Sequence, residues 1–518
     1  MRPEKATLGF VETPRFLVDR MLDLADLADL ANAPPAPQPS APRSPISVLD
    51  CGAGMGAIGC RLLERLPGAP LRVDLVEVHP PLVEAMLARS EGERAANRAR
   101  VVACDFLSGD FRPDVSYDYV IANPPYNAGG AIKTPTNTAL RKAEDGRVVW
   151  RAFVRRAVDA LRPGGEAILL VPSAWMRGRC ETHALLTREC VPLRIRCMGN
   201  TETNRAFDMQ AQTPTCIVHV RKRRGPDEPR AQHVELYDEG EWVRFPLFSP
   251  PNGGPATALP TSHARILAKL RAYVDTPHVG SLRGRVRKTT LPTRSNPVFK
   301  VKERQAEGCR ELGRAEPKEK GAATHANVRT CLLVPAEPEK GERGVRKKRK
   351  RPALVYERTA APTKYALPGA PPKLVLAHKM YGLPFLDASG DVGVTNADSY
   401  VVLPDKHGGA PGQGAGAIDE LLATQRLLCS PLALLVFESV RYRMRFLERE
   451  AFDFLPLLPS PQEKEKMMVG GHENIDIDDE EAHVMSAAGL DAEDVERVRR
   501  FGEALRFEAD PRRMRVQT

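Results

Sequence analysis

Short apolar runs alternate with amphipathic stretches over residues 46–171. Five of the runs have the length of buried strands: Ile46–Leu49, Leu71–Val76, Arg100–Ala103, Tyr117–Ala122 and Ala167–Val171. The segments between them have the 3.6-residue periodicity of helices, as at Trp150–Leu161. This alternation predicts a doubly wound α/β sheet.

Further elements flank this region. A helix is expected from about Pro14 to Ala31, and it is followed by a proline-rich surface spacer at residues 33–45. Two more strands are expected at Arg194–Cys197 and Thr215–Val220. After Lys222 the alternation of strand-like and helical segments ends. A turn-rich segment then precedes a helix that is expected at Ser262–Val274.

The carboxyl-terminal part has fewer clear patterns. Residues 281–351 hold few apolar clusters, which predicts a basic and partly disordered connector. Strand-like alternation returns at Pro371–Val402, and a helix is expected over Ile418–Phe446. The tail from Gln462 is acidic and ends in an expected helix at Ala492–Phe507.

Length and composition fit a soluble chain. With 518 residues, 42% hydrophobic and 27% charged, two or three folding units are expected. No stretch of about 18 apolar residues and no signal-peptide core are found, so we expect no membrane association and a cytosol-like compartment. Ten cysteines form no CxxC pair, so neither a metal site nor a disulfide framework is predicted.

The net charge of +10 is unevenly distributed. Residues 281–351 hold 21 basic and 8 acidic residues, a net of +13, whereas residues 463–518 hold 15 acidic and 9 basic residues, a net of −6. Such a basic stretch indicates a polyanion binder or a solvated linker. Within it, Arg346–Arg351 is a phosphate clamp, a nuclear localisation signal in a eukaryotic host, or part of a linker.

Glycines and acidic residues stand at successive strand ends. Asp50, Gly52 and Gly54 follow the first strand, where a glycine loop lets the backbone approach a ligand. Glu77 closes the next strand, where a carboxylate accepts hydrogen bonds from a ribose diol. Asp105 and Phe106 end the third strand, where a carboxylate and a phenyl ring suit an adenine base.

The fourth strand ends in Asn123-Pro124-Pro125-Tyr126, at the edge where open α/β sheets bind ligands. Each motif alone also fits an ordinary turn or strand terminus. Their occurrence at four successive strand ends favours a functional site.

The series Asp50/Gly52/Gly54, Glu77, Asp105 and Asn123–Tyr126 resembles the S-adenosylmethionine-dependent amino-methyltransferases. Gly9-Phe-Val-Glu-Thr-Pro14, ahead of the glycine loop, resembles the amino-terminal cofactor motif of gamma-class (Taq-type) adenine-N6 DNA methyltransferases. The resemblance covers about residues 7–222 with specific motifs and about 371–459 more loosely. It implies a Rossmann-like core and a carboxyl-terminal α+β target-recognition region.

Four parts are expected along the chain, and the resemblance implies which residues bind the cofactor. The parts are a catalytic domain at 1–224, the basic connector at 225–351, a recognition region at 352–461 and the acidic tail at 462–518. S-adenosyl-L-methionine would be bound by Thr13, Asp50, Gly52, Gly54, Glu77, Asp105, Phe106 and Asn123. The partner implied is double-stranded DNA, and any DNA cleavage would need a separate restriction endonuclease.

The expected chemistry follows from the properties of the amino group that receives the methyl group. An adenine amine is a poor nucleophile because its lone pair is delocalised into the ring. If Asn123 Oδ1 and the Pro124 carbonyl accept its two N–H bonds, the lone pair is directed at the sulfonium methyl group. Pro125 stiffens the loop, and Tyr126 would stack on a flipped adenine with Phe207 opposing it, although a core role for Phe207 fits its sequence equally.

Two other functions fit the same residues. The Asn-Pro-Pro-Tyr sequence also suits an RNA base or a protein glutamine side chain, which are planar nitrogens too. A third possibility is a catalytically inactive DNA-binding scaffold that keeps the fold. The long region after the core argues against glutamine, and the intact acidic residues with Asn123 argue against an inactive scaffold.

Overall fold

The protein is described here by a computed structural model that divides into two compact units. Unit 1 comprises residues 1–264 and 442–444, and unit 2 comprises residues 265–441 and 445–518. The residues that the structure describes are 11–25, 27, 45–111, 116–126, 148–178, 180–208, 213–249, 256–288, 325–335, 350–359, 371–377, 384–390, 392–394, 399–404, 414–442, 447–458 and 480–504. Residues 33–44 of the proline-rich spacer, Gly9 and Arg346–Arg349 lie outside them.

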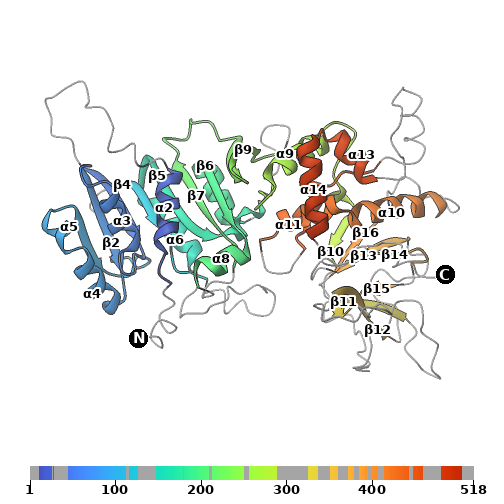
Figure 1. The fold of residues 1–518 in the computed structure, drawn as a ribbon, viewed down its shortest axis with the longest axis horizontal. Helices are drawn as coiled ribbons and strands as arrows, with labels where there is room; N and C mark the ends of the chain where they lie inside the picture. Colours follow the sequence, from blue (N-terminus) through green and yellow to red (C-terminus); the bar gives the residue numbers. More distant parts are fainter. Residues whose placement is uncertain are drawn as a thin grey trace. The chain divides into compact units, whose positions relative to one another are not determined.

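Unit 1 is built on a nine-stranded sheet with the order β3-β2-β1-β4-β5-β7-β6-β8-β9 (Figure 1). Strands β1 to β5 are parallel, β7 runs antiparallel between β5 and β6, and β8 is parallel to β6. The strands are β1 (Ile46–Cys51), β2 (Leu71–Glu77), β3 (Ala99–Ala103), β4 (Tyr117–Ala122), β5 (Leu161–Pro172), β6 (Cys190–Met198), β7 (Thr215–Lys222), β8 (His233–Asp238) and β9 (Glu241–Pro246). The predicted doubly wound α/β fold is confirmed.

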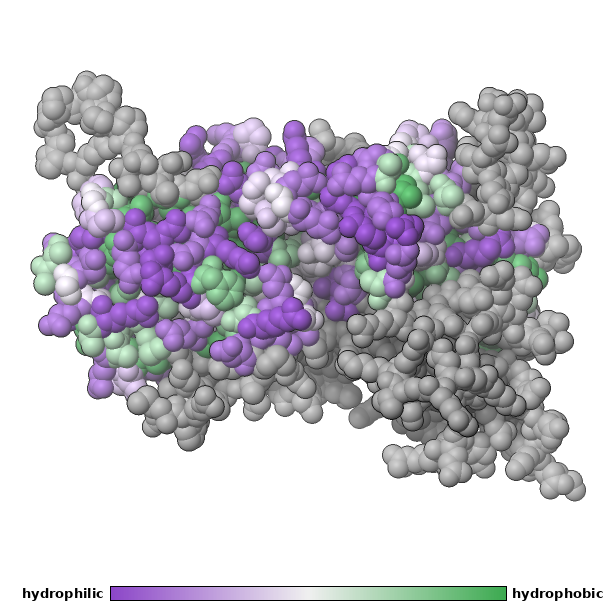
Figure 2. All heavy atoms as spheres, viewed as in Figure 1, coloured by the Kyte–Doolittle hydropathy of each residue, from purple (hydrophilic) through white to green (hydrophobic). Residues whose placement is uncertain are grey.

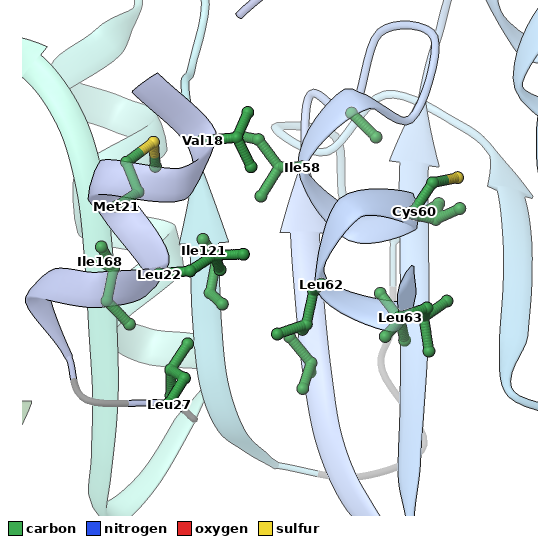
Figure 3. Packing of buried hydrophobic residues seen from close by; sticks show 14 of the residues in the cluster. Val18, Met21, Leu22, Leu27, Ile58, Cys60, Leu62, Leu63, Ile121 and Ile168 are labelled. Carbon is green, nitrogen blue, oxygen red and sulfur yellow. The ribbon is translucent and has the colours of Figure 1, made fainter. Parts of the chain in front are cut away.

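Helices α2 (Arg15–Leu24) and α3 (Ala57–Arg65) pack on one face of this sheet. Their apolar side chains meet over Ile121 of β4 and Ile168 of β5, as Figure 3 shows. Helix α6 (Trp150–Ala160) packs against β4 and β5. The remaining helical segments of unit 1 are α4 (Pro80–Arg89), α5 (Glu91–Ala95), η4 (Ser173–Arg177), α7 (Glu181–Ala184), η5 (Leu185–Glu189) and α8 (Asn200–Ala206).

Unit 1 contains two strands that follow residue 224 in the chain. Strands β8 and β9 form an antiparallel hairpin, and β8 pairs with β6 through Arg194 and Glu235. This pairing extends the sheet of unit 1, which includes residues up to Ala264. The turn-rich composition of the connecting segments concealed the two strands from the sequence pattern.

Unit 2 combines two small sheets with helices. A four-stranded sheet has the order β10-β16-β13-β14, and a three-stranded sheet has the order β12-β11-β15. The strands are β10 (Val286–Lys288), β11 (His325–Pro335), β12 (Lys350–Thr359), β13 (Lys373–Ala377), β14 (Phe385–Asp387), β15 (Gly393–Val394) and β16 (Ser399–Val402). The helices are α9 (Ala264–Val274), η6 (Leu282–Gly284), α10 (Gly414–Cys429), α11 (Pro431–Ser439), η8 (Arg449–Asp453), α13 (Glu480–Ala487) and α14 (Ala492–Ala504).

One sequence prediction for unit 2 is corrected. The single helix expected at Ile418–Phe446 is interrupted, because Ser430 caps α11 by accepting a hydrogen bond from Ala433 N (3.3 Å) and Pro431 begins it. The basic segment 281–351 contains β10, β11 and the start of β12, so part of it is ordered. Its residues 289–324 and 336–349, on which the predicted disorder chiefly falls, lie outside the described residues.

The acidic tail is folded against unit 2 over residues 480–504. Asp491 accepts from Arg265 Nη2 (2.6 Å) and Lys269 Nζ (2.9 Å) of α9, and Asp494 also pairs with Lys269. Glu480 binds Arg426 of α10 at 2.6 Å. The negative charge of the tail is therefore partly used to hold helices together.

The described surface is mainly polar. On the face drawn in Figure 2, hydrophilic residues cover most of it and hydrophobic residues form small patches. The exposed large hydrophobic residues in the described ranges are Phe16, Val78, Trp242 and Val495. No single helix there is long and apolar enough to cross a bilayer; the bent pair 416–429 and 431–439 passes that test only jointly, with a 64° bend.

A prediction concerns Gly59, at which α3 lies closest to β2. A Cβ atom at this position would overlap with Leu75 Cδ2 and lie 3.1 Å from Val73 Cγ1. We expect Gly59→Ala to lower the free energy of unfolding by about 1–3 kcal/mol, because the packed core has no room for the added carbon. Urea denaturation of both variants provides the measurement. Gly92→Ala is the control, since no atom lies within 4 Å of its added Cβ, and equal destabilisation by the two changes would contradict the account.

Candidate active site

The carboxyl ends of β1, β2 and β4 bring the predicted motifs together in unit 1. β1 lies between β2 and β4, so the strand order reverses beside it, which is where open α/β sheets bind ligands. Gly52 has φ +74°, and a Cβ on it would lie 3.3 Å from Pro125 Cδ and 3.5 Å from Phe153 Cε1. The glycine loop and the Asn123–Tyr126 loop are therefore in close contact.

Glu77 fixes the shape of the glycine loop. Its Oε2 accepts from Gly54 N at 2.9 Å, and its Oε1 accepts from Val78 N at 2.9 Å and His79 N at 3.0 Å. The residue is only 6% exposed. A carboxylate has about four acceptor sites, so these three bonds leave little capacity for the predicted ribose contact without rearrangement.

Asp50 lies buried beneath the same loop. Its Oδ2 accepts from Gly59 N at 3.0 Å, and its Oδ1 is buried without a hydrogen-bond partner among the described residues. Burial raises the pKa of Asp50 to about 7; the Gly59 N–H opposes this rise, and the negative charge of Glu77 adds to it. An unpaired buried acceptor of this kind is suited to a cationic donor from a ligand.

Asn123 is oriented by Thr13. The Asn123 Nδ2 group donates to Thr13 Oγ1 at 3.0 Å, although the two residues are 110 positions apart in the chain. Thr13 is buried and Asn123 is partly exposed. Because the amide nitrogen is engaged, Oδ1 is directed away from Thr13 and is available to accept from another donor.

Tyr126 follows at the end of this loop. Its hydroxyl group is buried without a hydrogen-bond partner in the described ranges, while the residue as a whole is partly exposed. Burial raises the pKa of Tyr126 well above its usual value. The hydroxyl group therefore stays protonated and does not act as a base.

Asp105 and Phe106 have different surroundings. Asp105 is exposed, and its Oδ1 accepts from Leu107 N at 2.8 Å. Phe106 is 2% exposed, with its ring centroid 5.2 Å from that of Phe111 and 5.4 Å from that of Phe153. In this structure the ring is a core side chain, so the predicted contact of Phe106 with an adenine base requires its neighbours to move.

Phe207 borders a cleft of about 370 Å³ in unit 1. The residue is 4% exposed and belongs to the apolar cluster under α2, which matches the core role that its sequence also allowed. Thr13 lines the same cleft. The other lining residues are Val11, Glu12, Pro14, Arg15, Val18, Ala57, Arg61, Glu64, Arg89, Ala206 and Asp208.

The structure thus brings most of the predicted site residues together, and it shows one further residue, Gly59, that supports the site. Asp50, Gly52, Gly54 and Glu77 form one loop cluster, and Gly52 links it to the Asn123–Tyr126 loop. Gly59 was not predicted, yet it both supports Asp50 and allows close helix packing. A glycine inside the predicted helix after the loop was the available signal for it.

The residues present fit S-adenosylmethionine on two observations. Asp50 Oδ1 is an orphaned buried acceptor beside the loop, and it suits the ammonium group of an amino acid. The loop glycines have positive φ values of 74°, 58° and 76° at positions 52, 54 and 56, which leaves backbone exposed without Cβ atoms. Within the described residues, no group of three or more His, Cys, Asp or Glu side chains is placed to hold a metal ion.

Fold and site define a class of protein domain: unit 1 contains a Rossmann-like, S-adenosylmethionine-dependent methyltransferase domain. Residues 40–179 match the family model described as Methyltransferase small domain. This match identifies S-adenosylmethionine as the cofactor, as predicted.

Curated relatives match about a quarter of the chain. It is 31% identical over 137 residues to the release factor glutamine methyltransferase of Moorella thermoacetica, which covers 24% of this chain and 46% of the relative. It is 23% identical over 128 residues to the tRNA1(Val) (adenine(37)-N6)-methyltransferase of Shewanella halifaxensis, which covers 24% of this chain and 50% of the relative. The chain thus spans about half the length of the curated relatives it matches.

Two of the solved structures to which the chain is similar are the following. One is the type I restriction-modification system methyltransferase subunit from Streptococcus thermophilus, with a TM-score of 0.31, 16% identity, and coverage of 44% of this chain and 47% of that one. The other is TrmN from Thermus thermophilus, with a TM-score of 0.27, 18% identity, and coverage of 40% of this chain and 48% of that one.

The raised pKa of Asp50 predicts a pH-dependent stability in the absence of cofactor. Between pH 4 and pH 7 the unfolded chain ionises Asp50 while the folded protein keeps it protonated, so the folded state binds more protons. The free energy of unfolding should fall over this range by an amount on the order of a few kcal/mol. Urea denaturation at unit intervals from pH 4 to pH 8 measures it.

Asp50→Asn is the matched variant for this test, because its amide is neutral at every pH. The difference in stability between variant and wild type should grow from pH 4 to pH 7 in favour of the variant and then stay constant. A difference that does not change with pH would show that Asp50 titrates normally.

Proposed function

We propose that the protein is a DNA adenine-N6 methyltransferase, which transfers a methyl group from S-adenosylmethionine to the amino group of a flipped adenine. The observation that carries amino-methyl transfer is the hydrogen bond from Asn123 Nδ2 to Thr13 Oγ1. It holds the Asn123 amide with its oxygen available to an amino group. Asn123 Oδ1 is therefore one of the two hydrogen-bond acceptors that an amino group with two N–H bonds needs.

The second acceptor is the Pro124 carbonyl. When Asn123 Oδ1 and this carbonyl accept the two N–H bonds, the nitrogen lone pair is drawn out of the ring and toward the methyl donor. S-adenosylmethionine, when bound, supplies that electrophilic methyl group. Proline residues at 124 and 125 restrict the loop, and contact with Gly52 fixes its position against the glycine loop.

Target stacking is the further element of this proposal. Tyr126 is partly exposed at the end of the Asn123 loop, where a ring face offers contact to a flipped base. Phe207 is nearly buried, so it opposes the base only if α8 and the segment after it shift. Unstacking a base costs a few kcal/mol, which contact with aromatic faces offsets.

DNA is favoured as the substrate by charge and by chain length. Residues 281–351 carry a net charge of +13, and each phosphate neutralised by such residues releases counterions. Unit 2 adds a second folded body to the methyltransferase domain. A small peptide loop needs no such body, whereas a duplex must be held and its sequence read.

Protein glutamine is the second candidate, and the comparisons favour it in one respect. Three of the relatives that match over the catalytic region are named release factor glutamine methyltransferase, at 30–31% identity. A glutamine amide is a planar nitrogen with the same demand for two acceptors. Its chemistry fits Asn123 and Pro124 equally.

The proposed function is tested by transfer of labelled methyl groups to duplex DNA, RNA and protein extract in parallel. We expect label in DNA, recovered as N6-methyladenine after nucleoside digestion. Label confined to protein, recovered as methylglutamine, would establish the second candidate instead. Label confined to RNA would also overturn the proposal.

Three variants test the role of Asn123. Asn123→Ala should lower kcat by a factor on the order of 10² or more while cofactor affinity stays within about twofold, because it removes an acceptor at the reacting nitrogen. Thr13→Val should lower kcat by about tenfold, since the amide loses its hydrogen-bond partner, whereas Thr13→Ser keeps the hydroxyl group and should retain activity. Undiminished turnover in Asn123→Ala would remove the assignment.

A further inference from the structure

The edge of the sheet in unit 1 carries a group of arginine and aromatic side chains on one face. They are Arg194 and Arg196 of β6, Tyr237 of β8, and Trp242 and Arg244 of β9. We call them the Arg–aromatic patch. Strand pairing places Tyr237 opposite Trp242, and Glu235 opposite Arg244 and beside Arg194.

The patch is assembled by stacking. The Arg196 guanidinium lies 4.1 Å from the centroid of the Tyr237 ring, and the Arg194 guanidinium lies 5.3 Å from that of Trp242. The two rings meet edge to face, with centroids 5.3 Å apart and an interplanar angle of 69°. Cation–π contact of this kind holds both arginines on the surface in a defined orientation.

Within the patch three arginines lie near one acidic residue, Glu235, and the adjoining hairpin tip carries Asp238, Glu239 and Glu241. Arg194 pairs with Glu235 at 3.3 Å and donates to the Leu24 carbonyl at 3.2 Å. Arg196 makes no ion pair or hydrogen bond with the described residues, and Arg244 bonds to His233 Nδ1 at 3.2 Å without an acidic partner among them. Stacking on a ring occupies the face of a guanidinium group and leaves its in-plane N–H groups able to bind an anion.

The patch lies near the same end of the strands as the active site. Strands β4, β5, β6 and β8 all run in the same direction, so Tyr237, near the end of β8, lies at the edge where β4 leads into Asn123. Three strand spacings of about 4.8 Å separate β4 from β6 and five separate it from β9, a span of about 14–24 Å. At about 3.4 Å per nucleotide, this corresponds to about four to seven nucleotides.

We propose that the Arg–aromatic patch binds the sugar–phosphate backbone of the DNA substrate about four to seven nucleotides from the target adenine. Arg196 and Arg244 contact phosphates, and the exposed Trp242 ring packs against a deoxyribose. The inference rests on the proposed function and gives it a docking surface within the methyltransferase domain itself. It requires no residue of the basic segment 281–351.

Tryptophan fluorescence provides a direct probe, because the chain has three tryptophans and two of them are buried. Trp242 is 37% exposed, whereas Trp150 and Trp175 are 1% and 0% exposed. A duplex of about 20 base pairs containing adenines should quench the emission of the wild-type protein. Trp242→Phe should bind the duplex with little change in fluorescence, and an undiminished change in this variant would place the contact elsewhere.

Charge removal tests the phosphate contact. Arg196→Gln should raise the Kd for the duplex by about 5–30-fold at 0.15 M salt and reduce the slope of log K against log salt by about 0.9. Arg72→Gln is the matched control, since Arg72 is an exposed arginine on β2, the strand next to the opposite edge of the same sheet. It should leave the Kd within about twofold, and both variants should bind S-adenosylmethionine like the wild type.

The outcomes separate this inference from the function on which it rests. If the wild type methylates DNA but Arg196→Gln matches Arg72→Gln in both Kd and salt slope, the docking surface is wrong and the proposed function stands. If the methyl label enters only protein or RNA, the proposed function fails and the docking surface fails with it. Selective loss of DNA affinity in Arg196→Gln, with methylated DNA from the wild type, supports both.

Discussion

The close approach of two loops is the constraint on which the site depends. Gly52 adopts a left-handed backbone at φ +74°, and a side chain there would press on Pro125 and Phe153. The glycine at this position therefore lets the loop after β1 lie against the loop after β4. Their contact sets the cofactor loop and the proposed acceptor Asn123 side by side, while Glu77 holds the shape of the first loop and Thr13 the orientation of the second.

The sequence was sufficient for the catalytic sheet and its motifs, because buried parallel strands are continuous apolar runs and the site residues follow them directly. It did not predict the contacts that individual side chains make with the rest of the protein. Thr13 accepts a hydrogen bond from Asn123, and the Phe106 ring packs against those of Phe111 and Phe153. Such contacts depend on where distant segments meet, and no local pattern encodes this.

Strands in unit 2 and at the sheet edge were also less visible. β8 alternates exposed and buried positions and β9 is mostly exposed, so the apolar signal of both strands is weak. The break between α10 and α11 was signalled by Ser430-Pro431, a cap followed by a helix-initiating proline. The acidic tail appeared as a charge imbalance, whereas the structure uses Asp491 and Asp494 to bind α9.

The central claim is that the glycine loop beside Asn123 holds the cofactor, and calorimetric titration with S-adenosylhomocysteine tests it most directly. The wild type should bind one molecule per chain, and Gly52→Val should lose this binding while its circular dichroism stays that of the folded protein. Gly68→Val, at a position with nothing near its added Cβ, should bind like the wild type. Wild-type affinity in Gly52→Val, or no binding to the wild type, would contradict the account.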